Sequence, residues 1–288
     1  MRVLEMLPYL LCTLFLFAAG CAQETDFQRS IPLEGQSNFR DIGGYKTVDG
    51  QTVRSGIVFR SGELHGLTEK DVQTLSELGI GTVVNFLSPA EIEARGADVL
   101  PAGTKEVLQP IESGDGLVAE VLEARRTGDF SKVPADLNPK LHELLVDEAQ
   151  EQYAALIRAI IAAEGEPLAY HCSHGIHRTG TATAIILSAL GVPWESVRSD
   201  YLLSNETRAS EVGPRLEQLR LAAAETFGQD PADVDMTNIN AFYILEGSYI
   251  DGTLNRIEEE YGDIETYLKK GLGLSEEEIG LLRHRLLK

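Results

Sequence analysis

The sequence has 288 residues, of which 43% are hydrophobic, enough for one good-sized folded domain with a full core. Its 45 acidic and 25 basic residues give a formal net charge of −20. A surface this acidic repels nucleic acids and anionic lipid headgroups, so a phosphate-bearing ligand would have to be attracted by local donors.

The first predicted segment is an N-terminal leader. Val3–Ala19 is almost entirely apolar, and its core is too short to span a bilayer but has the length of a signal-peptide core. The stretch Phe17-Ala18-Ala19-Gly20-Cys21 resembles a bacterial lipobox. That resemblance implies that residues 1–20 are removed as a lipoprotein signal peptide. A plain secretory signal cut near Ala22, or an uncleaved anchor, is the alternative.

The lipobox resemblance also implies the location of the mature chain. Cys21 would be acylated and become the new N-terminus, and residues 21–31 would form a polar tether. The protein would then be exported and lipid-anchored to a bacterial membrane, on its periplasmic or extracellular face. Cys12 leaves with the leader, so Cys172 remains as a single thiol that has no partner for an internal disulfide. Such a thiol in an oxidising compartment indicates a functional cysteine.

The first part of the folded region begins with strand and turn signals. Asp49-Gly50, between Tyr45–Val48 and Gln51–Val53, predicts a hairpin with a type I′ turn. Ile57–Phe59 continues as a strand. Thr68 is predicted to cap a helix that Gly79 closes, and Gly81–Phe86 is predicted to be a buried parallel strand.

The middle of the chain alternates in the same way. Glu91–Ala97 is predicted to be a helix and Glu106–Leu108 a strand. A loop-rich insert is expected near residues 110–147. After it, Ala149–Ala163 carries apolar residues at helical spacing, and Pro167–His171 is predicted to be a strand.

The last third is predicted to be helical. Thr179–Leu190 and Trp194–Leu202 are expected to be helices, and Ser275 with Glu278 forms a capping box for a C-terminal one. Strands that alternate with helices predict an α/β fold, with a central, mostly parallel sheet flanked by helices. We therefore expect one domain over residues 32–288.

The segment His171-Cys172-Ser173-His174-Gly175-Ile176-His177-Arg178-Thr179-Gly180 carries the chemistry. A strand ends at Cys172 and a helix begins at Arg178, so the loop between them can turn its N–H groups inward and bind an anion without a metal. A helix N-terminus and a nearby guanidinium lower the pKa of a thiol, which makes Cys172 the predicted nucleophile. Arg178 presents a fork that matches two phosphate oxygens. The predicted phosphate-binding residues are Ser173, His174, Gly175, Ile176, His177 and Arg178.

Two neighbours are expected to support this loop. Thr179 is predicted to donate its hydroxyl to the sulfur of Cys172 when the phosphate departs. His171 is predicted to order the loop through hydrogen bonds.

The pattern His-Cys-x-x-Gly-x-x-Arg-Thr-Gly resembles the signature of protein tyrosine and dual-specificity phosphatases. Asn38–Tyr45, Phe59–Gly62, Asp200–Asn205 and the segment from Tyr261 to Leu287 resemble the bacterial tyrosine phosphatase family that includes secreted mycobacterial and Listeria enzymes. The resemblance covers most of the mature chain. It implies a cysteine-phosphatase fold, a phosphocysteine intermediate, no cofactor or metal, and activity on phosphotyrosine, with phosphoserine, phosphothreonine or phosphoinositides as further substrates.

The chain departs from that family at the residues that would supply a proton. Ile176-His177 stands where many members have Lys-Asp, and Asn85-Phe86-Leu87 stands where they have Asp-Leu-Arg. His177 resembles the residue of fungal and plant atypical dual-specificity phosphatases, some of which act on inositol pyrophosphates. Because Asn85 cannot donate a proton, the general acid is expected elsewhere. The candidates are Asp41, which comes first because it lies in a family motif, His177, and three acids of the insert, Glu112, Asp115 and Asp129.

Four functions remain open at this point. The first is hydrolysis of phosphotyrosine and related esters of a phosphorylated protein or a small molecule. The second is hydrolysis of phosphoinositides or inositol phosphates, including pyrophosphates. The third is a non-catalytic phosphate-binding lipoprotein, against which the pair of Cys172 and Arg178 counts. The fourth is rhodanese-type sulfur transfer, which the Arg-Thr-Gly ending and the flanking motifs disfavour.

Overall fold

The computed structural model describes residues 29–112 and 117–288. The leader, Cys21 and most of the tether expected over residues 21–31 lie outside the described residues. The last tether residues belong to the domain, because Ser30 forms a bridge with Arg40 and the amide of Ile31 donates to the carbonyl of Phe39. Within the described ranges, no helix is both long and apolar enough to cross a membrane.

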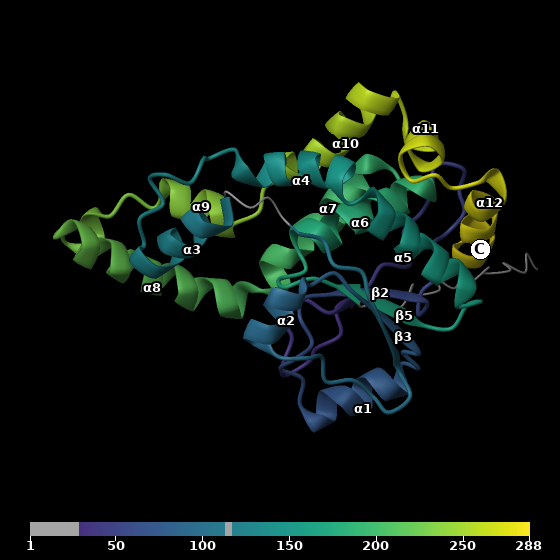
Figure 1. Ribbon diagram of the computed structural model, residues 1–288, viewed down its shortest axis with the longest axis horizontal. Helices are drawn as coiled ribbons and strands as arrows, with labels where there is room; N and C mark the ends of the chain where they lie inside the picture. The colour runs from purple at the N-terminus through teal and green to yellow at the C-terminus, as the bar shows by residue number, and fades with distance from the viewer. Residues whose placement is uncertain (1–28, 113–116) are drawn as a thin grey trace, which may run out of the picture.

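A five-stranded sheet forms the centre of the molecule, in the order β1-β2-β5-β3-β4 (Figure 1). All neighbouring pairs are parallel except β1 with β2, so the predicted α/β fold with a mostly parallel sheet is confirmed. The strands are β1 Arg40–Asp41, β2 Val58–Ser61, β3 Thr82–Asn85, β4 Lys105–Leu108 and β5 Leu168–His171.

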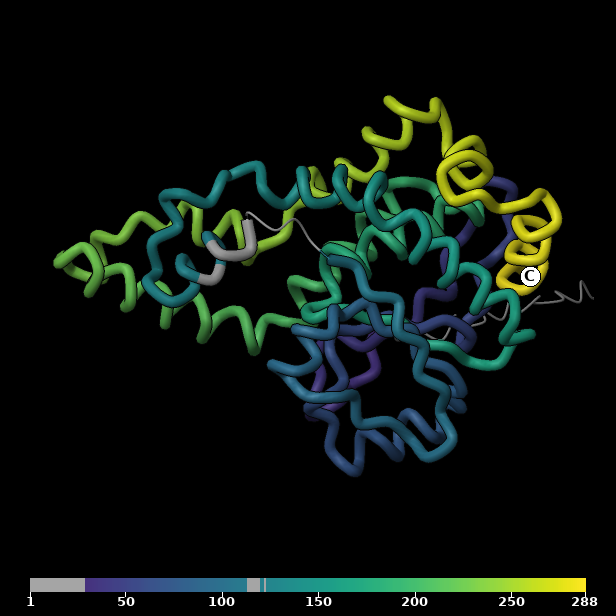
Figure 2. Tube along the Cα trace, viewed as in Figure 1, coloured from purple at the N-terminus to yellow at the C-terminus, as the bar shows by residue number. Residues whose placement is uncertain are grey.

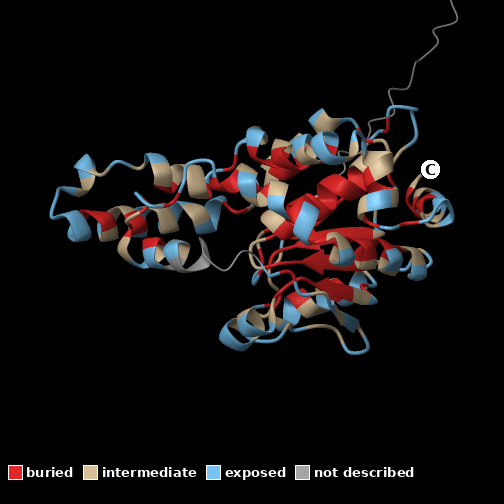
Figure 3. Ribbon diagram, turned by 45° about the horizontal axis from the view of Figure 1, so that its top comes forward, coloured by how far each residue is buried: buried red, intermediate tan, exposed pale blue. Residues whose placement is uncertain are grey.

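Helices cover both faces of the sheet, and alternate strand residues face them because side chains alternate along a strand. Val58, Val84 and Tyr170 pack into the larger core, whereas Phe59 and Val83 pack into a smaller core on the opposite face. Strands β1, β2, β3 and β5 are buried almost throughout (Figure 3), whereas the edge strand β4 is mostly exposed. Apart from three α-helices that form the arm described below, the described α-helices are α1 Glu69–Glu77, α2 Pro89–Arg95, α4 Leu137–Glu148, α5 Gln150–Ala162, α6 His177–Ala189, α7 Trp194–Thr207, α10 Gly247–Tyr261, α11 Ile264–Thr266 and α12 Glu276–Leu286.

Helix starts follow local signals. Thr68 caps α1 in a capping box with Asp71, and Ser275 caps α12 in one with Glu278, as the sequence predicts. The turn at Asp49-Gly50 is not type I′, because only Gly50 has a positive φ, +87°. The amide of Gly50 donates to the carbonyl of Thr47, which is the pattern of a three-residue loop ending in a glycine bulge.

The expectation of a loop-rich segment at residues 110–147 is wrong, because α3 (Leu117–Thr127) and α4 occupy most of it. Helix α3 packs with α8 (Ala209–Phe227) and α9 (Thr237–Tyr243) into an arm at one end of the molecule (Figure 2). The arm has its own small core, to which Phe130, Leu219 and Ile239 contribute. Packing against residues about a hundred positions away stabilises a segment whose own sequence favours a loop.

Candidate active site

The loop after β5 is held from outside by its carbonyl groups. The carbonyl of Ser173 accepts from the amide of Glu63 at 3.1 Å, and that of His174 accepts from Nδ2 of Asn38 at 3.1 Å. The carbonyl of Gly175 accepts from Nη2 of Arg60 at 2.7 Å. Because these carbonyls point outward, the loop's N–H groups turn toward its centre, as an anion nest requires.

Gly175 is required at the turn of this loop. It has φ +68°, in the left-handed region that favours glycine, and a Cβ there would lie 2.6 Å from the carbonyl oxygen of Ser61. Ser61 ends β2, which pairs with β5 beside the loop. The sheet therefore sets the loop's shape as much as the loop's own sequence does.

The sulfur of Cys172 lies inside the loop, and its side chain is buried. Burial by itself would raise the pKa of this thiol. The positive charge of Arg178, the hydroxyl of Thr179 and the amides of Thr179 and Gly175 outweigh burial and lower the pKa below its usual value. Cys172 therefore has the environment of a nucleophilic thiolate, and Thr179 lies where the sequence predicted it.

Arg178 is fixed in the first turn of α6. Its Nη1 and Nη2 atoms each lie 2.7 Å from a carboxylate oxygen of Glu91, and Nη1 also donates to the carbonyl of Phe86 at 3.0 Å. Burial opposes the charge of Arg178, but the hydrogen bonds it donates to Glu91 and the charge of Cys172 raise its pKa overall. The guanidinium is thus a permanently charged group in a fixed orientation beside the sulfur.

His171 supports the loop from behind. Its Nε2 lies 2.7 Å from Oδ2 of Asp98, and its Nδ1 lies 3.3 Å from the carbonyl oxygen of Cys172. Both side chains are almost fully buried. The predicted ordering role of His171 agrees with these contacts, and Asp98 is its anchor.

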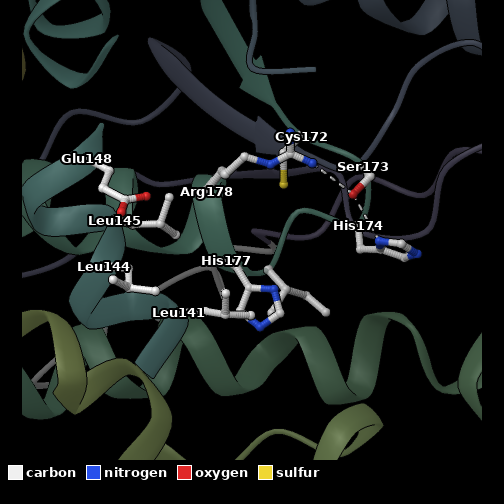
Figure 4. Close-up of a pocket in the computed structure, with 10 residues that line it drawn as sticks. Leu141, Leu144, Leu145, Glu148, Cys172, Ser173, His174, His177 and Arg178 are labelled. Carbon is white, nitrogen blue, oxygen red and sulfur yellow. Dashed lines mark hydrogen bonds between the residues drawn. The ribbon is translucent and has the colours of Figure 1, made fainter. Parts of the chain in front are cut away.

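A cavity of about 80 Å³ opens beside the sulfur (Figure 4). One wall comes from α4, which contributes Leu141, Leu144, Leu145 and Glu148. Figure 4 shows Leu144, Leu145 and Glu148 on one side of Cys172, and Ser173 with His174 on the other. Among the described residues that line this cavity, Glu148 is the one carboxylic acid.

His177 lines the cavity, but its ring is held in the neutral form. Burial and the nearby arginines Arg178, Arg208 and Arg125 lower its pKa to about 3. Asn138 donates from Nδ2 to the carbonyl of Ala241, so its Oδ1 faces Nε2 of His177 at 2.7 Å and accepts that proton. A neutral ring with its one N–H engaged cannot be the general acid, so this candidate is wrong.

Asp41 is not at the site either. Its two carboxylate oxygens accept from the amides of Gly43 and Gly56. Gly56 precedes β2, whereas the reactive loop follows the opposite, C-terminal ends of β2 and β5. The family motif that contains Asp41 therefore builds the sheet edge, and Asp41 is corrected from candidate acid to structural residue.

Two of the insert's three candidate acids, Glu112 and Asp129, do not provide the missing group. Oδ1 of Asp129 accepts from the amide of Ser131 at the arm, and neither Asp129 nor Glu112 lines the cavity. Asp115 lies outside the described residues. Asn85 also points away from the cavity, because its Nδ2 donates to Asp98 and Glu106. An aspartate at position 85 would face two carboxylates, so its absence removes no acid from this site.

The family motifs upstream form a buried ion network instead. Arg40 and Arg60 both pair with Asp200 of α7, with Arg60 Nη1 2.6 Å from Oδ2. Burial opposes ionisation, but the two arginines lower the pKa of Asp200 to about 2. This network connects β1, β2 and α7, and through Arg60 it also holds the carbonyl of Gly175.

Sequence reasoning missed Glu91, Glu148, Asp98 and Asn138. Only Glu91 had a local signal: with Ser88 it forms a capping box at the start of α2. Its second use, holding Arg178, depends on β3 and β5 bringing α2 to the loop. Among the described residues, no group of three or more His, Cys, Asp or Glu side chains could hold a metal ion.

Comparison with known proteins agrees with this geometry. The model of the tyrosine phosphatase family matches residues 31–288. The chain is 28% identical over 257 residues to a candidate tyrosine-protein phosphatase of Cupriavidus necator, covering 88% of each. It is 27% identical over 283 residues to the triple specificity protein phosphatase PtpB of Mycobacterium tuberculosis, covering 88% of this chain and 98% of that protein. A solved structure, TpbA of P. aeruginosa, is 18% identical with a TM-score of 0.30 and covers 67% of this chain and 90% of that one; a score this low adds nothing to the assignment.

Proposed function

The chain belongs to the tyrosine phosphatase family, and on that premise we propose that it hydrolyses phosphotyrosine through a phosphocysteine formed on Cys172. The observation that carries the proposal is the thiol of Cys172, whose pKa is lowered inside a ring of amides beside Arg178. A protein that only binds phosphate would not need a nucleophilic thiol with a lowered pKa.

In the first step the thiolate of Cys172 attacks phosphorus and the bond to the leaving oxygen breaks. The leaving oxygen keeps the electron pair and needs a proton. Arg178 and the inward amides hold the three equatorial oxygens, where charge is spread in the transition state.

Glu148 is the group we assign to give that proton. It lines the same cavity as Cys172, whereas Asp41 and His177 are both unable to act there. A carboxylic acid positioned over a leaving group contributes typically about 10²–10⁴-fold to the rate. Glu148 is thus the general acid of the proposed mechanism.

In the second step water attacks the phosphocysteine. Glu148, now a carboxylate, takes the proton of that water, and the sulfur–phosphorus bond breaks. The departing sulfur becomes a thiolate again, stabilised by the hydroxyl of Thr179 and the charge of Arg178. Inorganic phosphate leaves, and the site returns to its starting state.

The apolar wall of the cavity favours an aromatic ester. Leu141, Leu144 and Leu145 form a surface against which the flat ring of phosphotyrosine can lie, while the polyol ring of an inositol phosphate would leave its hydroxyls facing leucines. The mycobacterial relative is named a triple specificity phosphatase, so phosphoserine, phosphothreonine and phosphoinositides belong in the substrate panel.

The test compares the leaderless protein with its Cys172→Ser variant on p-nitrophenyl phosphate, phosphotyrosine peptides, phosphoserine and phosphothreonine peptides, and inositol phosphates. We expect turnover of the aryl esters by the unaltered protein, loss in the variant, full activity in EDTA and inhibition by vanadate. Equal, near-zero rates in both proteins on every substrate would leave only phosphate binding. A preference for inositol phosphates over phosphotyrosine would replace the substrate class but keep the mechanism.

We also propose that the mature enzyme is exported and anchored to a membrane by acylation of Cys21, on the lipobox resemblance of Phe17–Cys21. Expression of the full chain in a bacterium with radiolabelled palmitate tests this. Label in the unaltered protein and none in Cys21→Ser is the expected result. An unlabelled, secreted protein of leaderless mass would indicate a plain secretory signal.

A further inference from the structure

A second cavity, of about 340 Å³, adjoins the active site on its arm side. Its wall includes Arg125 of α3, Arg208 at the C-terminal end of α7 and Arg215 of α8. His174 of the reactive loop lines both cavities. The two are therefore neighbours, separated by one side chain of the loop that binds the reacting phosphate.

The second cavity is cationic in a chain whose net charge is −20. Three guanidinium groups line it against one carboxylate, that of Glu211. Glu211 neutralises them poorly, because it is half exposed, lies 3.9 Å from Nε of Arg208 and also accepts from the hydroxyl of Ser37. Burial, together with the charges of Arg125, Arg208 and Arg95, holds the pKa of His174 well below its usual value.

Two polar atoms in this wall have no partner within the described part of the chain. They are Nε of Arg125 and the hydroxyl of Tyr243, a side chain with 7% of its surface exposed. Arg208 is also buried, with 5% exposed, and its one salt-bridge partner within the described residues is Glu211. A buried donor without an acceptor costs free energy, so a site that keeps several together is suited to an anion that satisfies them.

Phosphate is the anion that this wall fits best. Arginine forks bind two phosphate oxygens at once, and a doubly charged group can be shared by three guanidinium groups. Tyr243 supplies a further donor. A carboxylate, with one charge and two oxygens, would use only part of the wall.

The position of the cavity indicates which part of the substrate reaches it. The leucine wall of α4 lies on one side of Cys172 and His174 on the other (Figure 4). A phosphotyrosine ring against the leucines would leave the peptide next to it free to pass His174. The two cavities adjoin at His174, and an extended chain advances at most about 3.3–3.6 Å per residue, so the residues next to the phosphotyrosine in sequence are the ones nearest the arginines.

Building on the proposed function, we propose that Arg125, Arg208 and Arg215 form a second phosphate subsite, which selects phosphotyrosine peptides that carry another phosphorylated residue one or two positions away. An inositol ring with two phosphates would offer the arginines the same chemistry as a doubly phosphorylated peptide. The leucine wall favours the peptide, because it suits the aromatic ring of phosphotyrosine and not the polar inositol ring.

The experiment measures kcat/KM for phosphotyrosine peptides of one sequence, with alanine, glutamate or phosphoserine at each of the two positions on either side. At one or more positions we expect phosphoserine to raise kcat/KM about tenfold to a hundredfold over alanine, with a smaller gain for glutamate. The gain should fall steeply as salt is raised. The same kcat/KM measurement is made in parallel on inositol bisphosphates and monophosphates.

The variants are Arg125→Gln, Arg215→Gln and Arg208→Lys, with Arg220→Gln as the matched control. Arg220 lies on α8 but pairs with Glu217, away from the cavity. We expect the two glutamine variants to lose most of the ratio between phosphoserine and alanine peptides, Arg208→Lys to lose less, and Arg220→Gln to keep all of it. A ratio within one variant is insensitive to partial unfolding, and thermal melting checks that each variant is folded.

The outcomes separate the two proposals. If the unaltered protein hydrolyses phosphotyrosine peptides with no preference for a second phosphate at any position, the subsite is wrong and the proposed function stands. If it hydrolyses no phosphotyrosine peptide, the proposed function fails first. A preference confined to inositol bisphosphates and lost in Arg125→Gln would overturn the proposal that the second phosphate belongs to a peptide. The arginines would then be a site for the second phosphate of an inositol headgroup.

Discussion

Glu91 holds Arg178 in place: each of its carboxylate oxygens lies 2.7 Å from a different terminal nitrogen of the guanidinium. The same carboxylate accepts from the amide of Ser88 at 2.9 Å and so caps α2. One side chain therefore sets both the start of a helix and the orientation of the group that binds phosphate. Burial would raise the pKa of Glu91, but its hydrogen bonds with Arg178 lower that pKa. The carboxylate is therefore ionised and pairs with the charged guanidinium.

We predict that Glu91→Gln lowers kcat/KM for p-nitrophenyl phosphate about 10–100-fold, because a misplaced guanidinium no longer matches the transition state. The affinity for vanadate should fall in parallel. Ser88→Ala is the control: it removes the side-chain half of the capping box, costs about 1 kcal/mol of stability and leaves Arg178 held. If both variants kept full activity, Glu91 would be a helix cap and nothing more.

Glu148→Gln is predicted to make the rate depend strongly on the leaving group. Phenyl and alkyl phosphates need protonation of the leaving oxygen, so their kcat should fall about 10²–10⁴-fold, while p-nitrophenyl phosphate should lose much less. Kinetics over a series of substituted phenyl phosphates measure the slope of log kcat against the pKa of the leaving phenol. Glu151→Gln, an exposed position on α5, and Asp41→Asn should keep the slope of the unaltered protein. A steep slope in Asp41→Asn alone would mean that Asp41, and not Glu148, is the general acid.

Three histidines that are held neutral in the folded protein predict a loss of stability in mild acid. Burial holds the pKa of His142 and His174 well below the usual value, and that of His177 at about 3, so these rings stay neutral when folded. In the unfolded chain they gain protons below about pH 6.5. Their contribution is therefore complete above that pH and falls as pH drops below it; for His177 the loss continues toward pH 3, by up to about 1.4 kcal/mol per pH unit.

Urea unfolding between pH 6.5 and 5 measures this effect above the range where most carboxylates titrate. We predict that the free energy of unfolding of His177→Asn falls less steeply with decreasing pH than that of the unaltered protein. The difference in slope should correspond to about one proton. His284→Asn, at an exposed position, should leave the slope unchanged. Identical slopes in all three proteins would mean that His177 is protonated in the folded state.

Asp200 is predicted to matter most for stability. Asp200→Asn leaves Arg40 and Arg60 buried without a counter-charge, which we expect to cost about 3–5 kcal/mol at pH 7. The folded pKa of about 2 lies below the unfolded value, so the carboxylate's contribution is full above about pH 4 and is lost as pH falls through 2. Chemical unfolding at several pH values should show the two proteins converging over that window.

The control for this prediction is Asp136→Asn, which removes an exposed partner of Lys140 and should change little. Equal stability of Asp200→Asn and the unaltered protein at pH 7 would contradict a structural role for the network. Reduced activity without reduced stability would instead indicate that Asp200 acts through Arg60 on the loop.

The sequence predicted the elements that depend on neighbours in the chain. The strand, loop and helix around Cys172 and the caps at Thr68 and Ser275 are all set by residues within a few positions of one another. The resemblance of the loop and flanking motifs predicted the family, which the match over residues 31–288 confirms. Thr179 and His171 also lie beside Cys172, where their predicted roles place them, because both are its near neighbours in the sequence.

Tertiary structure alone decided which distant side chains complete the site. Glu91, Glu148 and Asp98 reach the reactive loop from α2, α4 and the segment before β4, through parallel strand pairing that brings the ends of β2, β3 and β5 to one edge. The same packing turned Asp41 away and held His177 neutral. Local signals fix a residue's backbone, whereas the pKa and partners of its side chain depend on what folds against it, and those groups come from other parts of the chain.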